Sequence, residues 1–237
     1  MRRVIFITGA SGAIGSACAR QLAGEGHQLL LHYNRNAQAI ENLRRDIPES
    51  ILGTVQADLT REEGINELVR FLAFPIDQLV YAGGMAHYGL FQDMTAEAMD
   101  DLLHVHVKAP WRLCQHMLQP MLAQKKGGIV LISSIWGERG ASFEAAYSSV
   151  KAAQIGFVKA LAKETGTSGV RVNAVTPGVI DTEMNSNLTK EEREQLTGEI
   201  PMNRFGTAGE VAEAVSYLLS DSASYINGHV LQVNGGW

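Results

Sequence analysis

The chain has 237 residues, of which 46% are hydrophobic and 19% are charged, and its formal net charge is -5. This length supports one sizeable α/β core and is too short for two ordinary ones, so we expect a single domain over residues 1–237. The acidic balance gives no cationic surface for phosphate contacts, and no apolar run reaches the roughly 18 residues of a bilayer span, which argues against nucleic-acid binding and membrane insertion. Two arginines lead directly into a short apolar run, unlike a secretory signal peptide, so we expect a cytoplasmic protein.

Short apolar runs alternate with amphipathic segments along the whole chain. The expected strands cover residues 4–8, 28–33, 51–56, 76–81, 128–133, 171–175 and 229–233. The expected helices cover residues 13–25, 37–46, 62–72, 96–123, 144–165 and 208–219. This alternation predicts an α/β fold with a Rossmann-like, doubly wound, seven-stranded parallel sheet and helices on both of its faces. Cys18 and Cys114 fall inside expected helices, and we expect buried thiols rather than a disulfide.

Residues 177–207 interrupt the alternation. The segment is polar, contains two prolines and has one modest helical stretch over residues 190–197. A long excursion at the carboxyl edge of a parallel sheet favours a substrate lid over a linker. Its acidic side chains would attract an amine-bearing substrate or a basic protein surface; the alternative is that they only solvate a mobile helix. These residues are Asp181, Glu183, Glu191, Glu192 and Glu194.

A glycine-rich turn directly follows the first expected strand. Its sequence, Thr-Gly-Ala-Ser-Gly-Ala-Ile-Gly over residues 8–15, opens a long expected helix. Glycines at this spacing let the backbone turn sharply and approach a pyrophosphate at the helix N-terminus. Glycines can also serve packing alone, but the position of this turn favours a dinucleotide site. The expected cofactor contacts are Gly9, Ser11, Gly12, Ala13, Ile14 and Gly15.

The end of the second expected strand indicates which dinucleotide binds. NAD usually requires an acidic residue there for its ribose hydroxyls, whereas this chain reads His-Tyr-Asn-Arg-Asn. Arg35 offers donors that suit a 2′-phosphate, and Asn34 and Asn36 supply neutral hydrogen bonds, so NADP(H) is the expected cofactor. A solvated arginine in a loop is the alternative. After the third strand, Asp58 beside Leu59 would accept from the adenine amino group or cap the next helix.

The strongest chemical signal is Tyr147 followed four residues later by Lys151, which places a phenol and an ammonium on one face of a helix. An ammonium about 4 Å away, at an effective dielectric near 20, supplies roughly the 4 kcal/mol that would bring a tyrosine pKa from about 10 to about 7. Ser134 ends the fifth expected strand at the same edge and would hold a substrate carbonyl while Tyr147 donates the proton. The tyrosine and lysine alone would more often decorate a helix surface, but the combined features predict a carbonyl-reducing site.

With these motifs the chain resembles the short-chain dehydrogenase/reductase family over nearly its whole length, close to the 3-oxoacyl-[acyl-carrier-protein] reductase branch. The resemblance implies catalysis by Ser134, Tyr147 and Lys151, with the last two also contacting the cofactor, and no metal ligand. It also implies a homotetramer that pairs the helices over residues 96–123 and 144–165. Further cofactor contacts implied by the family pattern are Ala82, Gly83, Pro177, Gly178, Val179 and Thr182, the last four around the nicotinamide carboxamide.

Two positions depart from the family pattern. The fourth strand ends in Tyr81-Ala82-Gly83-Gly84, where the family usually has Asn-Asn-Ala-Gly. His106 stands where the resemblance implies a fourth catalytic residue, an asparagine whose main-chain carbonyl serves a water relay to the lysine. The histidine carbonyl would supply the same relay, and its imidazole would either titrate near neutral pH or pack against the neighbouring strand. These departures leave a second hypothesis open, a catalytically silent NADP(H)-binding regulatory protein.

The expected substrate is a ketone that is carried by a protein. Lys125 and Lys126 remain where the 3-oxoacyl branch docks acyl carrier protein, but Ser168 stands where an arginine is expected. The chain also resembles a Bacillus-type subgroup assigned as elongation factor P 5-aminopentanone reductases, which reduce a ketone attached to a lysine side chain. The shared stretches are residues 31–34, 133–137 and 140–142, with His106 and Pro110. We therefore predict an NADPH-dependent carbonyl reductase that acts on one of these two partners.

Overall fold

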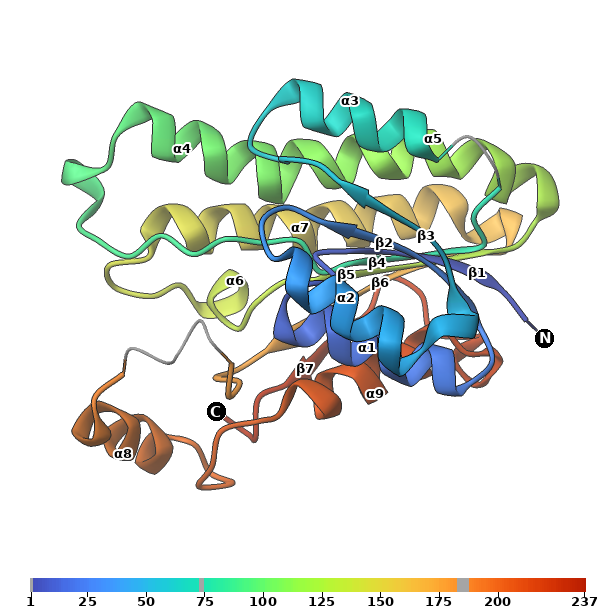
Figure 1. Ribbon diagram of the computed structural model, residues 1–237. Helices are drawn as coiled ribbons and strands as arrows, with labels where there is room; N and C mark the ends of the chain where they lie inside the picture. The colour runs from blue at the N-terminus through green and yellow to red at the C-terminus, as the bar shows by residue number, and fades with distance from the viewer. Residues whose placement is uncertain (1, 73–74, 183–187) are drawn as a thin grey trace.

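The computed structural model describes residues 2–72, 75–182 and 188–237, and these residues form a seven-stranded parallel sheet between two layers of helices (Figure 1). The strand order is β3-β2-β1-β4-β5-β6-β7, so the direction of winding reverses between β1 and β4. The strands are β1 (Val4–Thr8), β2 (Gln28–Tyr33), β3 (Ile51–Gln56), β4 (Gln78–Tyr81), β5 (Gly127–Ile132), β6 (Val170–Pro177) and β7 (Val230–Val233). The predicted Rossmann-like fold is confirmed.

Helices cover both faces of the sheet (Figure 1). One face carries α3 (Glu62–Phe71), α4 (Ala96–Leu103), α5 (Ala109–Gln124) and α7 (Ala145–Thr165). The other face carries α1 (Ala13–Gly24), α2 (Ala37–Asp46) and α9 (Ala208–Leu219). Two shorter helices, α6 (Trp136–Arg139) and α8 (Lys190–Glu199), follow β5 and β6. No helix built from the described residues combines the length and the apolar character that a membrane span needs.

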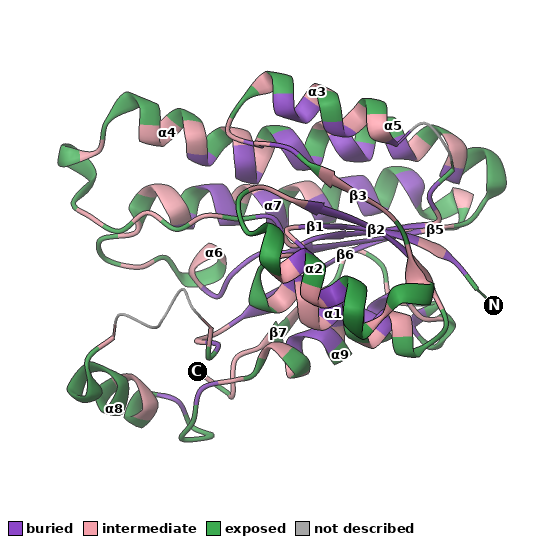
Figure 2. Cartoon of the chain, viewed as in Figure 1, coloured by how far each residue is buried: buried purple, intermediate pink, exposed green. Residues whose placement is uncertain are grey.

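The two helical layers bury separate apolar clusters against the sheet. In β1, Phe6 belongs to the cluster under α3, α5 and α7, whereas Ile5 and Ile7 belong to the cluster under α1, α2 and α9. All three side chains are fully buried, which explains why the strand is apolar without interruption. Each contributes roughly 1.5–3 kcal/mol through burial. In Figure 2 the inner strands β2, β1, β4, β5 and β6 are buried along most of their length, whereas the edge strands β3 and β7 and the helix α8 have no buried residue.

The long helix expected in the middle of the chain is divided by one π-helical turn, η3 (His104–Lys108), between α4 and α5. The physical reason lies in Pro110, because it has no N–H to donate to the His106 carbonyl in a regular α-helix. From the sheet, the buried Tyr81 hydroxyl donates to the Val105 carbonyl in the same turn. The widened turn therefore offers main-chain carbonyls to side chains of neighbouring elements.

The excursion after β6 balances much of its acidic charge internally. The partners are Asp181 with Arg193 (3.0 Å), Glu194 with Lys190 (3.8 Å), and Glu192 with Thr189 in the capping box of α8. These contacts favour the solvating role of the acidic side chains over attraction of a substrate. Glu191 lies in the first turn of α8, and Glu183 lies outside the described residues.

Candidate active site

The predicted site residues lie at one edge of the sheet. Because all strand pairs are parallel, the segments that leave β1 to β6 emerge at the same side. The glycine turn comes after β1, and the other predicted residues follow the next strands directly. In chain order these are Arg35, Asp58, Ala82, Ser134 and Gly178. The fold thus brings together segments that are distant in the sequence.

The turn between β1 and α1 allows close approach to its backbone. Gly9 has a φ of 63°, and a Cβ there would lie 2.7 Å from the Ala82 carbonyl oxygen. A Cβ on Gly15 would overlap the Gly9 carbonyl. Gly12 is the N-cap of α1, which has no side-chain cap and no acidic residue in its first turn. The uncapped amides at this helix end fit the phosphates of a dinucleotide. The remaining predicted residues of the turn are Ser11, Ala13 and Ile14.

His32 holds the glycine turn in place, a role that the sequence did not reveal. It is buried in β2, where its Nδ1 accepts from the Gly9 N–H at 3.3 Å and its Nε2 lies 3.0 Å from the Ala57 carbonyl oxygen. Burial lowers the pKa of His32 to about 4, so at neutral pH the ring is neutral and donates from Nε2. The available signal was a polar residue inside an apolar strand.

Asp58 forms a small polar cluster with residues near the end of β2. Burial raises its pKa, but hydrogen bonds from the Thr60 N–H and hydroxyl outweigh burial, with help from the charges of Arg35 and Arg61, so the pKa is lowered overall. The Asn34 amide donates to the same carboxylate oxygen at 3.3 Å. Arg35 itself is exposed. The cluster therefore holds an ionised carboxylate next to an available guanidinium.

Two of the predicted cofactor contacts have side chains that the fold already uses. The Asn36 side chain caps α2 by accepting from the Ala39 N–H at 3.0 Å. Leu59 is buried in the apolar cluster under α3, and its side chain packs next to Gly83, where a Cβ would lie 3.6 Å from Leu59 Cδ1. The alternative that Asp58 caps the next helix is not what the structure shows, because the N-cap of α3 is Arg61.

The altered segment after β4 keeps its small residues against the glycine turn. The N–H groups of Ala82 and Gly83 donate to the Thr8 hydroxyl at 3.1 and 3.0 Å. A Cβ on Gly84 would lie 3.1 Å from Cε1 of His106. The segment therefore connects the cofactor end of the edge with the chemical end, and only a glycine fits beside the histidine without a shift.

Ser134, Tyr147 and Lys151 meet at the chemical end. Tyr147 and Lys151 lie one turn apart on α7, with the lysine Nζ 5.7 Å from the centroid of the phenol ring. Ser134 follows β5 and is hydrogen-bonded to the phenol. Tyr147 is half-buried, whereas Ser134 and Lys151 are buried. A Cβ on Gly137 of α6 would lie 2.8 Å from the Lys151 carbonyl carbon, so α6 packs directly on this part of α7.

Burial shifts the pKa values of Tyr147 and Lys151, and the shift of Tyr147 is opposite to the one that the sequence predicted. It raises the pKa of Tyr147 to about 12, because the lowering effect of the Ser134 hydrogen bond is smaller and the Glu144 charge adds to the increase. Desolvation also lowers the pKa of Lys151 to about 7. The expectation that Lys151 brings the Tyr147 pKa toward neutrality is therefore wrong for this structure. At neutral pH the phenol keeps its proton and the lysine is only partly charged.

His106 is fully buried in η3 and contacts the main chain after β4. Its Nε2 lies 2.8 Å from the Met85 carbonyl oxygen, and its ring meets Tyr147 edge-on with centroids 5.6 Å apart. Burial, followed by the charge of Lys151, lowers the pKa of His106 to about 3. Titration near neutral pH, one of the two expectations for this residue, is therefore wrong, and the structure supports the packing alternative.

The segment after β6 completes the edge. Pro177 ends the strand, and the Gly178 N–H donates to a main-chain carbonyl of β7 at 3.0 Å. A Cβ on Gly178 would lie 2.9 Å from Cα of Asn234, so the chain passes close to the C-terminal segment here. Val179 and Thr182 follow and are half-buried. These predicted nicotinamide contacts lie in sequence directly before the residues that the structure does not describe.

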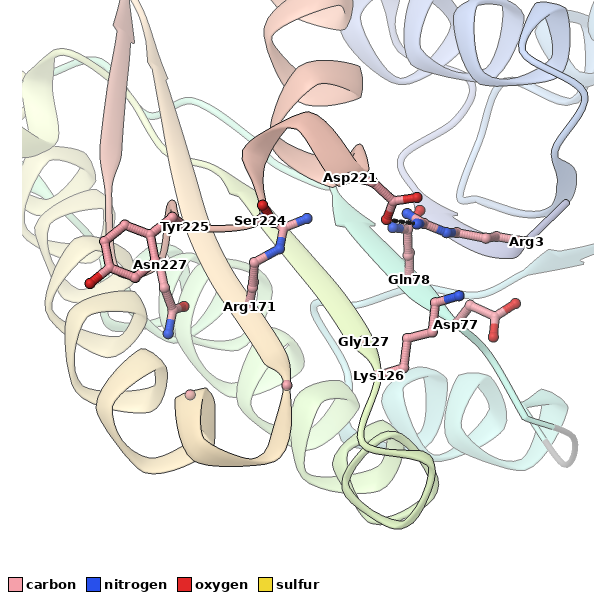
Figure 3. Close-up of a pocket in the computed structure, with 12 residues that line it drawn as sticks. Arg3, Asp77, Gln78, Lys126, Gly127, Arg171, Asp221, Ser224, Tyr225 and Asn227 are labelled. Carbon is pink, nitrogen blue, oxygen red and sulfur yellow. Dashed lines mark hydrogen bonds and ion pairs between the residues drawn. The ribbon is translucent and has the colours of Figure 1, made fainter. Parts of the chain in front are cut away.

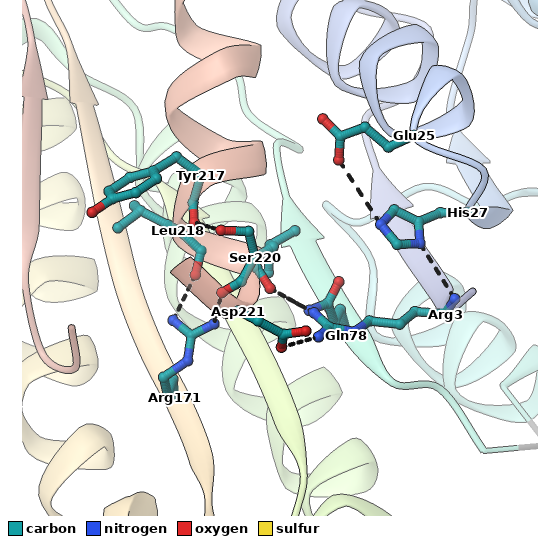
Figure 4. A network of polar contacts seen from close by, with 10 residues as sticks. Arg3, Glu25, His27, Gln78, Arg171, Tyr217, Leu218, Ser220 and Asp221 are labelled. Carbon is teal, nitrogen blue, oxygen red and sulfur yellow. Dashed lines mark hydrogen bonds and ion pairs between the residues drawn. The ribbon is translucent and has the colours of Figure 1, made fainter. Parts of the chain in front are cut away.

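A cavity of about 530 Å³ opens at the opposite edge of the sheet, where the strands begin (Figure 3). Three of its polar side chains, those of Arg3, Gln78 and Arg171, donate hydrogen bonds to the C-terminal end of α9 (Figure 4). Arg3 and Gln78 both donate to the Leu219 carbonyl at 2.7 Å, and Arg171 donates to the Leu218 carbonyl at 2.6 Å. Because these groups satisfy the carbonyls at a helix C-terminus, we assign the cavity to the architecture and not to the candidate site.

Comparisons with known proteins agree with this geometry. Residues 9–237 match the family model described as enoyl-(acyl carrier protein) reductase. The "uncharacterized oxidoreductase YmfI" of Bacillus subtilis (strain 168) is 43% identical over 240 residues, which cover 100% of this chain and 99% of the relative. The 3-oxoacyl-[acyl-carrier-protein] reductase FabG of Escherichia coli (strain K12) is 34% identical over 236 residues, covering 99% and 96%. The crystal structure of an actinorhodin polyketide ketoreductase with NADPH superposes with a TM-score of 0.90 at 28% identity, covering 99% of this chain and 97% of that one. This chain therefore belongs to the short-chain dehydrogenase/reductase family of oxidoreductases.

Proposed function

We propose that this chain is an NADPH-dependent carbonyl reductase that transfers hydride to a ketone. The observation that carries the proposal is the meeting of Ser134, Tyr147 and Lys151 at the sheet edge that also holds the glycine turn. The segment after β4 links the two, because Gly84 lies against Lys151 and Ala82 lies against Gly9. When bound, a reduced nicotinamide would supply the hydride.

The protonation states at this site suit reduction. A phenol with a pKa of about 12 is fully protonated at neutral pH, so Tyr147 holds the proton that a newly formed alkoxide requires. The Ser134 hydroxyl, already hydrogen-bonded to that phenol, would hold the carbonyl oxygen beside it. A charged Lys151 at 5.7 Å would stabilise the resulting phenolate by about 3 kcal/mol at an effective dielectric near 20. That energy is about as large as the net rise in the Tyr147 pKa from 10.0 to about 12, which corresponds to about 2.7 kcal/mol.

The preference for NADPH rests on the end of β2. Arg35 is exposed there and no carboxylate takes the place of the NAD ribose acceptor. Its charge also acts on Asp58, so the guanidinium lies near the residue proposed for the adenine end. The exposed guanidinium suits a 2′-phosphate, which carries two charges near neutral pH. The NADPH-bound ketoreductase structure supports the same cofactor class.

For the substrate we propose a ketone on a long arm attached to a protein, either elongation factor P or acyl carrier protein. The similarity to FabG supports a carrier-protein substrate, and the likeness to the elongation factor P subgroup supports a lysine-borne ketone. An exposed aromatic pair on the segments that follow β4 and precede α7 suits either arm: Tyr88 and Phe143 are stacked with ring centroids 5.3 Å apart. Phe143 has a φ of 64°, a strained conformation four residues before Tyr147. Parallel assays with acetoacetyl-acyl carrier protein and with ketone-bearing elongation factor P separate the two.

The decisive test is Tyr147→Phe, which removes the donated proton and little volume. We expect turnover to fall about a thousandfold with less than about a twofold change in NADPH affinity, because general acid catalysis is lost while the binding surface remains. NADPH absorbance gives the rate and fluorescence titration gives the affinity. The matched control is Tyr217→Phe, since Tyr217 is an exposed phenol on α9. Undiminished turnover in Tyr147→Phe refutes the proposed function.

A second candidate is a catalytically silent NADP(H)-binding regulator. The observation in its favour is that Tyr81 and His106 stand where the family pattern has asparagines, together with a Lys151 that is only partly charged at neutral pH. Such a protein would bind NADPH and leave its absorbance unchanged with every ketone offered. Consumption of NADPH in a panel of activated ketones, dependent on Tyr147, excludes this candidate.

We also propose that the chain assembles as a homotetramer through α5 and α7. Trp111 of α5 is 48% exposed and lies against Phe157 of α7, with ring centroids 6.0 Å apart. An exposed tryptophan packed on a partly buried phenylalanine, on two long neighbouring helices, suits a self-association surface. Sedimentation equilibrium at micromolar concentration is expected to give a tetramer, and Trp111→Glu a smaller species. A monomeric wild-type protein contradicts this proposal.

A further inference from the structure

A buried glutamine stands between the candidate lysine and the π-helical turn. Gln154 lies on α7, three residues after Lys151, and is 1% exposed. Its Oε1 accepts from the Lys151 Nζ at 3.5 Å, which is long, and its Nε2 donates to the His106 carbonyl at 3.0 Å. The amide orientation is fixed by its partners, because an ammonium only donates and a carbonyl only accepts. One side chain thus joins two predicted site residues.

Both partners of the glutamine are available for structural reasons. Pro110 cannot donate the N–H that would satisfy the His106 carbonyl in a regular α-helix, so this carbonyl can receive the Gln154 amide. The Lys151 ammonium is buried and has three donors, of which one reaches the Ile132 carbonyl at 2.8 Å. A buried ammonium without further acceptors would be costly. The Gln154 amide therefore gives the buried ammonium an acceptor and gives the His106 carbonyl a donor.

The connection continues to the segment after β4 through the histidine ring. Nε2 of His106 contacts the Met85 main chain, at 2.8 Å from its carbonyl oxygen. Nδ1 of His106 has no hydrogen-bond partner among the described residues. The hydrogen-bonded path from Lys151 therefore runs through the Gln154 side chain to the His106 main-chain carbonyl, and Nδ1 of the imidazole is not part of it.

We propose that Gln154 is a positioning residue that holds the Lys151 ammonium toward Tyr147 by an amide link to the His106 carbonyl. The inference rests on the proposed reductase function and adds a residue that the sequence motifs did not include. The family resemblance implies a water between these two groups, whereas here a side chain occupies the connection. An amide holds a lysine in one place without conducting protons away from it, unlike a chain of exchanging waters.

The electrostatic neighbours of Lys151 come from several elements. On α7 the facing titratable group is Tyr147, and from η3 it is His106. β5 contributes the Ile132 carbonyl, and Gly84 and Gly137 approach from the β4 segment and α6 without charge. At neutral pH the tyrosine and the histidine carry no charge, so carbonyl dipoles are the groups that stabilise the ammonium. Removal of one such dipole is expected to favour the neutral amine.

The experiment compares Gln154→Met and Gln154→Glu with the wild type. Lysines are labelled with 13C at Cε, Lys151 is assigned from the signal lost in Lys151→Met, and its titration is followed by NMR. In Gln154→Met the proton affinity of Lys151 is expected to fall about threefold to tenfold, the value of one ordinary hydrogen bond, because the contact of 3.5 Å is too long for a strong charge-assisted one. In Gln154→Glu it is expected to rise, because the new carboxylate faces the ammonium. The pH profile of kcat with NADPH and ethyl acetoacetate should shift in the same two directions.

Gln78→Met is the matched control. Gln78 is also a buried glutamine whose amide donates to a main-chain carbonyl, but it lies at the opposite edge of the sheet. This variant should lose stability and leave the titration of Lys151 unchanged. The inference is overturned if Gln154→Met titrates like the wild type, or if Gln78→Met shifts Lys151 equally. Because the NMR titration needs no turnover, a wild-type protein that reduces no ketone would count against the proposed function alone.

Discussion

The two edges of the sheet use the same kinds of side chain for different ends. At the amino edge, buried Gln78 donates to the Leu219 carbonyl, and at the carboxyl edge buried Gln154 donates to the His106 carbonyl. At the amino edge the cations that bind the helix end are Arg3 and Arg171, which stay charged. At the carboxyl edge the cation is Lys151, whose pKa burial lowers to about 7. A cation that is always charged suits a structural role, whereas a cation whose pKa lies near neutrality suits a role in proton transfer.

The comparison also shows that a large cavity need not mark the candidate active site. The cavity of about 530 Å³ lies at the amino edge, where Arg3, Gln78 and Arg171 already donate to main-chain carbonyls at the end of α9. The groups with strongly displaced pKa values and convergent contacts, Tyr147, Lys151 and His106, lie at the other edge. Side chains whose pKa values burial has shifted strongly are candidates for a reaction, because a bound substrate can change their protonation.

Arg3→Met should produce the largest change in stability, and it tests whether the amino edge contributes to folding but not to the reaction. Arg3 donates to the Leu219 carbonyl and pairs with Asp221, so its loss is expected to lower the free energy of unfolding by about 3 kcal/mol. The reaction rate per folded molecule should not change. Urea unfolding measures the first quantity and an activity assay the second. Arg20→Met, which removes an exposed pair with Asp46, is the control and should cost less than about 1 kcal/mol. A fall in kcat for Arg3→Met would break the division between the edges.

The second prediction concerns pH and the carboxyl edge. Burial lowers the pKa of His106 from 6.5 to about 3, so the unfolded chain binds a proton below pH 6.5 that the folded chain does not. The stability that depends on this neutral histidine is fully present above pH 6.5 and is lost as the pH falls toward 3. Between pH 7 and pH 5 it should cost about 2 kcal/mol of unfolding free energy.

Urea unfolding of His106→Asn checks this value. The pH dependence of its unfolding free energy between pH 7 and pH 5 should be about 2 kcal/mol smaller than in the wild type, whatever its absolute stability. His32, with a pKa of about 4, contributes in the same direction and remains in both proteins. Equal pH dependence in the two proteins would mean that the ring is solvated or protonated in the folded state.

Arg35→Ala should have the smallest effect and tests the cofactor end. The dissociation constant of NADPH is expected to rise about tenfold and that of NADH to stay the same, because only NADPH carries the phosphate that the guanidinium would contact. Fluorescence titration with both cofactors measures this. The control is Arg45→Ala, whose exposed guanidinium contacts Asn42 on α2. An equal loss for both cofactors would assign Arg35 to general charge, and no loss would leave it as a solvated loop residue.

The fold was predictable because local patterns and packing agree in this chain. Six of the seven strands start within one residue of their predicted position, since the apolar runs are bounded by glycines and polar turns; β4 starts two residues later. Parallel pairing then brings the residues after each strand to one edge, which gave the location of Ser134 and Gly9 without any side-chain information. The free, buried state of Cys18 and Cys114 is likewise confirmed.

What could not be predicted depends on burial and on contacts across long separations. The spacing of Tyr147 and Lys151 indicated proximity, but the direction of their pKa changes depends on how much water the fold removes from each. His32 and Gln154 are polar residues within buried segments, and their partners lie 23 and 48 residues away. Nothing in the neighbouring sequence names such partners. The division of the central helix has a local cause in Pro110, but its contact with the Tyr81 hydroxyl comes from a strand residue 24 positions away from Val105.

The π-helical turn η3 changes which face of α5 points toward the sheet, compared with an α-helix that continues α4 without interruption. One added residue in a helical path rotates everything that follows by about 100° relative to an uninterrupted α-helix. A single-residue deletion within His104–Lys108 would therefore restore a straight rod while turning either His106 away from the catalytic edge or Trp111 away from the outer surface.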